Sequence, residues 1–173
     1  MITYDQALLL LKRYLTDEKT IKHCLGVADV AYEMATKIKQ KNISLDINPE
    51  KVKIAALLHD IGRYKEGLHE LNTVEVLKKE GLDDIAKIAM HGFIYETPLA
   101  KNTAPDKFLP KTVENKIIVL ADMYYNQNEE RVSLKERFED IEKRYKNDKD
   151  FLQTVQLAKN RIQKLETEIK ALM

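Results

Sequence analysis

Cysteine, glycine and proline are scarce in this chain, and each scarcity restricts what the protein can be. One of the 173 residues is a cysteine, Cys24, so an internal disulfide cannot form and a reducing cytosol is the expected setting. We expect Cys24 to be a small buried core residue rather than a reactive thiol beside His23. Five glycines and four prolines provide few turn positions, so helices are expected to dominate the fold.

Long apolar runs are also missing. No stretch of the sequence approaches the roughly 20 apolar residues needed to cross a bilayer. The first residues lack the basic region and apolar run of a secretory signal. These absences predict a cytoplasmic protein with no membrane partner.

Charge of either sign is not in excess. Lys and Arg together number 29 and Asp and Glu 28, which gives a net charge of +1. This balance gives no general reason to expect a nucleic-acid partner, although it does not exclude a local basic pocket. With 44% hydrophobic and 33% charged residues, the chain reads as one soluble globular domain.

Apolar residues recur at helical spacing along most of the chain, which predicts an all-α, single-domain helical bundle. The segment 49–59 is apolar nearly all round and is therefore expected to be the central helix. Residues 67–72 are predicted to be a loop, and the irregular stretch 93–110 is long enough to be a functional flap. The predicted helices span residues 5–15, 20–39 (with a start at either 17 or 20), 49–59, 73–80, 84–90, 112–126, 134–145 and 150–172.

The last predicted helix has apolar residues near heptad spacing, which leaves two arrangements open. It can pack on the body of the same chain, which we favour, or on a second subunit in a homodimer. We therefore expect residues 1–126 to form the core and residues 127–173 a C-terminal extension packed on the same domain.

Polar residues that can bind a metal occur where the sequence is otherwise apolar. A single histidine at a helix end or on a buried face is more often a core residue than a ligand. Asp60 and Asp122 weaken that explanation, because burying an unpaired charge costs several kcal/mol. The histidines in question are His23, His59, His69 and His91.

The adjacent pair His59-Asp60 suggests how a metal would be bound. Neighbouring residues inside a helix point about 100° apart, so both can bind one ion only where the helix ends. Gly62 is expected to provide that end. Mixed nitrogen and oxygen ligands suit Mn, Fe, Co, Ni or Zn, whereas Mg prefers an all-oxygen shell.

This pattern resembles the HD-domain superfamily of metal-dependent phosphohydrolases. The resemblance covers residues 19–126 and is carried by His23, by the segment 55–63 around His59-Asp60, and by Leu120-Ala121-Asp122. Residues 131–138 are similar to the tail of small archaeal-type members.

The resemblance implies an HD-type helical bundle with one or two divalent transition metal ions per chain. The implied ligands of the first ion are His23, His59, Asp60 and Asp122. Some members bind a second ion through additional histidines, and His69 and His91 occupy such positions. Asp60 would then bridge the two ions.

The reaction implied is hydrolysis of a small phosphorylated substrate, such as a nucleotide, by a metal-activated water. Asp60 would accept a proton or orient the water, and His69 or His91, if not a ligand, would donate to the leaving oxygen. Arg63 and Lys65 are candidate phosphate clamps, with a solvated loop as the alternative for both.

Two other functions share these features. One is a di-iron oxygenase built on the same bundle, whose ligand set overlaps with that of the hydrolase. The other is a non-catalytic, metal-binding regulatory module, which the presence of all four core ligands disfavours. The sequence contains no glycine-rich phosphate loop, which argues against an ATP-driven enzyme.

Overall fold

Helices account for the regular structure of the chain in a computed structural model that describes residues 2–97 and 105–173. Within those ranges there is no β-strand, only an isolated bridge between Tyr125 and Arg131. The all-α prediction is therefore confirmed. The α-helices are α1 (Tyr4–Tyr14), α2 (Glu18–Lys41), α3 (Pro49–Leu57), α4 (His69–Lys79), α5 (Asp83–Ala86), α7 (Val113–Met123), α8 (Leu134–Arg144) and α9 (Lys149–Leu172), with 3-10 helices η1 (Ile61–Tyr64), η2 (Ile94–Glu96) and η3 (Pro105–Phe108).

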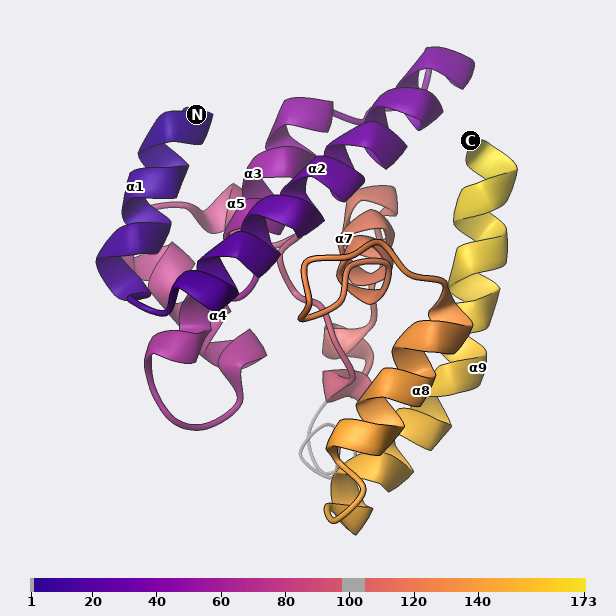
Figure 1. The fold of residues 1–173 in the computed structure, drawn as a ribbon. Coiled ribbons are helices and arrows are strands. Elements are labelled where there is room, and N and C mark those ends of the chain that lie inside the picture. Colours follow the sequence, from indigo (N-terminus) through magenta and orange to yellow (C-terminus); the bar gives the residue numbers. More distant parts are fainter. Residues whose placement is uncertain (1, 98–104) are drawn as a thin grey trace.

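The central helix is α3, as its apolar sequence predicts. It packs against α1, α2, α5 and α7, and Figure 1 shows it beside the long α2. Because it is covered on several sides, every side chain from Ile54 to Leu57 is buried. The helix therefore ends in the interior of the bundle, where the chain delivers its next residues, His59 and Asp60.

Helix starts follow the local capping residues. Asp17 begins α2 by accepting hydrogen bonds from the backbone N–H groups of Lys19 and Thr20, which decides between the two predicted starting points. Ser133 and Glu136 form a capping box at the start of α8. These local signals explain why the predicted starts of these helices are close to the observed ones.

The C-terminal helices lie against the rest of the chain, as Figure 1 shows for α9 and α7. Tyr124 donates a hydrogen bond to Glu166 across this contact. The buried side chains of α9 belong to the same hydrophobic cluster as those of α3 and α7. None of the described helices combines the length and apolar character required to cross a bilayer.

Two predicted boundaries are wrong. The segment 67–72 is not all loop, because α4 begins at His69 rather than at Thr73. The side-chain amide of Asn72 donates hydrogen bonds to the backbone carbonyls of Gly62, Lys65 and Glu66. Asn72 therefore binds the segment before α4 while remaining part of that helix.

The helix predicted at 84–90 is also shorter than expected. It ends at Ala86, so His91 comes from a non-helical segment that is closed by Gly92 at a φ of +72°. The predicted flap 93–110 contains the short helices η2 and η3. Residues 98–104 of that flap lie outside the described residues.

Gly62 does not end a helix, which corrects a further expectation. Helix α3 has already ended at Leu57, and Gly62 lies inside η1. A Cβ atom at position 62 would lie 2.2 Å from the carbonyl oxygen of His69 and 2.3 Å from the backbone nitrogen of Thr73. Glycine is therefore required because the backbones of η1 and α4 touch here.

Replacing Gly62 with alanine is expected to lower the free energy of unfolding by about 1–3 kcal/mol, because the added methyl group meets backbone atoms that cannot rotate away. Urea denaturation would measure the loss. The exposed substitution Glu66→Ala is the control and should change stability by no more than about 0.5 kcal/mol. Equal stability of the two variants would show that the close approach of η1 to α4 is not real.

Candidate metal centre

The predicted ligands come from separate elements and meet in the interior. His23 lies on α2, His59 and Asp60 follow α3, His91 follows α5, and Asp122 lies on α7. All but Asp122 are at least 97% buried. Within the described part of the chain, two groups have ligand atoms within 4.8 Å of one another, namely His23, His59 and Asp122, and His59, Asp60 and His91.

His59 belongs to both groups, and its ring nitrogen Nε2 faces carboxylate oxygens. Its Nδ1 lies 2.6 Å from the carbonyl oxygen of Ala56, so Nδ1 carries the proton. Complete burial outweighs the nearby carboxylates and lowers the pKa of His59 to about 3, which keeps the ring neutral. Its buried Nε2, which has no hydrogen-bond partner, therefore directs a lone pair towards carboxylate oxygens of Asp60 at 3.7 Å and Asp122 at 3.9 Å.

A lone pair that faces two carboxylates is repulsive unless a cation lies between them. The donor set of imidazole nitrogens and carboxylate oxygens is one that first-row transition metals accept. The backbone carbonyl of Ala56 fixes the tautomer of His59, as metal-binding histidines commonly require. The residues at this position therefore fit a divalent transition metal.

Asp60 is the most highly connected carboxylate of the cluster. Its Oδ1 lies 3.2 Å from Nε2 of His69 and 3.4 Å from Nε2 of His91, and its Oδ2 lies 2.6 Å from Nε of Arg63. Burial alone would raise the pKa of Asp60, but these neighbours and His59 hold it well below its usual range. The carboxylate is therefore ionised and can serve as a ligand.

Asp122 is also ionised. Its Oδ1 lies 3.1 Å from Nε2 of His23, and burial is opposed by His23, His59 and Arg137, which together lower the pKa of Asp122. His91 differs, because the hydrogen bond and charge of Asp60 outweigh burial and raise the pKa of His91 to about 9. Metal binding by His91 would therefore displace a proton.

Two predicted residues are placed differently from the core ligands. His69 contacts Asp60, but its ring also lies 3.1 Å from Nη2 of Arg63 and 3.4 Å from Oε2 of Glu70, and it belongs to neither ligand group. Lys65 is paired at 2.7 Å with Glu75 on the exposed side of α4. Lys65 is not among the residues that line the cavity described below, and its role as a phosphate clamp stays a prediction.

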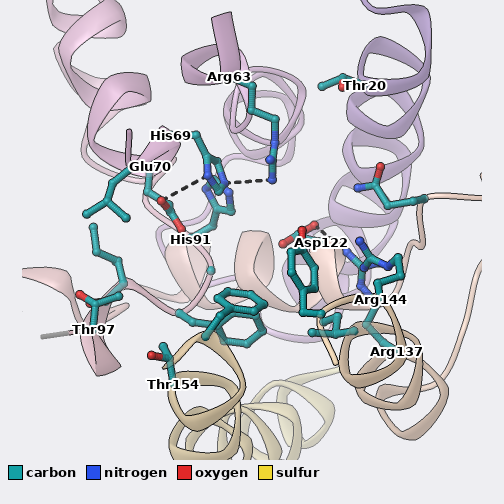
Figure 2. Close-up of a pocket in the computed structure, with 18 residues that line it drawn as sticks. Thr20, Arg63, His69, Glu70, His91, Thr97, Asp122, Arg137, Arg144 and Thr154 are labelled. Atoms are coloured by element: carbon teal, nitrogen blue, oxygen red, sulfur yellow. Dashed lines mark hydrogen bonds and ion pairs between the residues drawn. The ribbon is translucent and has the colours of Figure 1, made fainter. Parts of the chain in front are cut away.

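A cavity of about 370 Å³ lies beside the cluster (Figure 2). Arg63, His69 and His91 border it on one side, and Asp122, Arg137 and Arg144 on the other. Three aromatic residues also line the cavity, namely Phe93, Tyr145 and Phe151, and we call them the aromatic wall.

The sequence interpretation missed Arg137 and Arg144. The available signal was their spacing of seven residues, which is close to two helical turns and places both on one face of α8. That face also carries Ile141, which lines the same cavity.

The described residues thus form an all-α bundle with a buried cluster of histidines and aspartates that could hold a metal. The family model of the HD domain matches residues 20–127, a span that includes His23, His59, Asp60 and Asp122. The chain therefore belongs to the HD-domain family, as the sequence resemblance predicts.

The chain is also similar to other proteins of known sequence. An uncharacterized protein of Methanocaldococcus jannaschii is 37% identical over 126 residues, which cover 69% of this chain and 73% of the relative. Two proteins named tRNA (cytidine(56)-2'-O)-methyltransferase, from Thermoplasma volcanium and Picrophilus torridus, are 32% and 33% identical and are covered over 33% and 35% of their lengths. No solved structure matches the chain.

Proposed function

We propose that this chain is a metal-dependent phosphohydrolase that cleaves a small phosphorylated substrate, such as a nucleotide. The observation that carries the proposal is the Nε2 of His59, which faces two ionised carboxylates beside a cavity bordered by three arginines. A cation position next to an anion-attracting cavity is what hydrolysis of a phosphate ester requires.

In this proposal His23, His59, Asp60 and Asp122 hold a divalent ion, which is Mn, Fe, Co, Ni or Zn. A second ion would use His91 and His69, with Asp60 shared between the two. A bound ion lowers the pKa of its water ligand and withdraws charge from a phosphoryl oxygen. With an ion bound, Asp60 would orient that water or accept its proton.

The remaining side chains act on the substrate. Arg63 borders the cavity and carries guanidinium N–H groups that suit non-bridging phosphate oxygens. If His69 is not a ligand, its partly exposed ring is positioned at the cavity wall, from which it can donate a proton to the leaving oxygen.

The names of two relatives raise an RNA-linked role as a second possibility to test. Those names describe whole proteins, and the match covers about a third of each. Methyl transfer is therefore not carried over to this chain. The cavity volume of about 370 Å³ lies at the small end of ligand pockets and favours a small molecule.

The test is a metal-dependent activity screen. The purified chain would be assayed with Mn, Co, Ni and Mg against a generic phosphodiester, a phosphomonoester, a nucleotide panel and a short RNA. We expect turnover that is supported better by Mn, Co or Ni than by Mg. No turnover in any combination would contradict the proposal, and bound iron with a visible absorption band on exposure to oxygen would favour the di-iron oxygenase instead.

A further inference from the structure

Helix α8 brings a buried arginine to the cavity from outside the residues that match the family model. Arg137 is 5% exposed, and its Nη2 lies 3.7 Å from Oδ1 of Asp122. Its Nη1 lies 3.5 Å from Oδ2 of Asp140. Its Nε is buried without a hydrogen-bond partner. A buried guanidinium donor without an acceptor destabilises the protein unless a ligand supplies one.

Arg144 adds a second positive charge to the same end of the cavity. Its Nε and Nη2 lie 3.0 Å and 2.9 Å from Oδ2 of Asp140, the oxygen that Arg137 also approaches. One carboxylate is thus shared between two guanidinium groups. Asp122 is the other acid near Arg137, and its charge is already engaged by His23 and by the proposed metal position.

At this end of the cavity two guanidinium groups share Asp140, and the Nε of Arg137 has no acceptor. Figure 2 shows Arg137 and Arg144 near Asp122, across the cavity from His69. The group that would satisfy these donors is an anion that accepts several hydrogen bonds at once. Phosphate has that chemistry, and guanidinium groups bind it through paired N–H donors.

An aromatic wall lies next to the arginines in the same cavity. The rings of Tyr145 and Phe151 are 4.5 Å apart, and those of Phe93 and Phe151 are 6.0 Å apart. Tyr145 directly follows Arg144, so the charged end and the aromatic wall are joined at the end of α8. Such a wall suits a planar ring, because bases stack favourably on aromatic side chains.

We propose, resting on the hydrolase function above, that Arg137 and Arg144 form the phosphate subsite and that the aromatic wall binds a planar ring of the same substrate. The substrate class is a phosphomonoester with a planar ring, such as a nucleoside monophosphate. A monoester phosphate carries close to two negative charges at neutral pH, which the two guanidinium groups match. The C-terminal extension then determines specificity, while the family core supplies the metal ligands.

The test is calorimetric titration of the metal-loaded protein with inorganic phosphate and with AMP. Arg137→Gln and Arg144→Gln are each expected to weaken phosphate binding about 10- to 100-fold, the range expected for a lost hydrogen bond to a charged group. Metal content should not change. The matched control is Arg13→Gln. Arg13 lies on α1, outside the cavity, and is paired with Glu80.

The aromatic wall has its own readout. Tyr145→Ala is expected to weaken AMP binding about fivefold or more through lost stacking and to leave inorganic phosphate binding unchanged. Equal losses for AMP and phosphate would overturn the assignment of the ring to this wall.

The outcomes separate the subsite from the hydrolase proposal. The side chain of Arg144 is about one-third exposed, so this residue can be replaced without opening the core. Unchanged phosphate affinity in Arg144→Gln would therefore overturn the subsite even if Arg137→Gln did not fold. Failure of the unaltered protein to bind phosphate would do the same. Arginine-dependent phosphate binding without turnover of any ester would support the subsite and contradict the hydrolase.

Discussion

Replacing Asp60 with asparagine is expected to lower the turnover of any phosphate ester by about 100- to 1,000-fold, the loss typical of removing one electrostatic group at a reacting centre. Asparagine keeps the shape of the side chain but removes the charge that His69, His91 and Arg63 surround. Bound metal, measured by elemental analysis, should fall in the same variant.

The control for this variant is Asp84→Asn. Asp84 is an exposed carboxylate paired with Lys87 on α5, so its replacement changes the same chemical group without approaching the cluster. Both variants should retain the helical circular dichroism of the unaltered protein. Unchanged turnover in Asp60→Asn would remove the carboxylate from the mechanism.

Removing the metal with a chelator is expected to lower the midpoint of thermal unfolding by about 5–11 °C. Saturation at 100 times the dissociation constant contributes about 2.7 kcal/mol, and about 2–4 °C accompanies each kcal/mol in a chain of this size. The physical reason is that without a cation the lone pair of His59 and the carboxylates of Asp60 and Asp122 repel one another.

Differential scanning fluorimetry with and without added Mn or Zn measures this effect. The variant His59→Gln should lose most of the metal-dependent shift, because His59 is common to both ligand groups. A shift of the same size in the variant and in the unaltered protein would place the stabilising metal elsewhere. The exposed variant Asp84→Asn should retain the full shift.

The sequence predicted most helices because their buried faces are regular and their caps are local. Helix α3 is an example, since its apolar character on all sides indicates a central position without any knowledge of its neighbours. His59 and Asp60 were recognised for a related reason: polar side chains that follow such a helix need partners. The convergence of His23 and Asp122 on them follows from the family resemblance and not from spacing.

Some features of the fold and the site depend on contacts between segments that are distant in the sequence, and local patterns do not predict them. Gly62 looks like a helix terminator, but its small size is required by the backbone of α4. Lys65 is a candidate phosphate clamp in the sequence, and only the structure shows that it pairs with Glu75. Arg137 is an ordinary residue of a charged helix in the sequence, and only the packing of α8 buries it near Asp122. Each of these positions is defined by a neighbour that no local pattern identifies.

The proposed metal ligands and the C-terminal helices that line the cavity come from consecutive stretches of the chain, and this has a consequence for how related proteins can differ. The histidines and aspartates precede the short turn where Tyr125 pairs with Arg131, whereas α8 and the start of α9 follow it. The cavity-lining residues after this turn could therefore change while every proposed ligand atom is retained. Related proteins would then share the metal cluster and differ in the molecules they bind. We expect those differences to be concentrated in the residues after this turn.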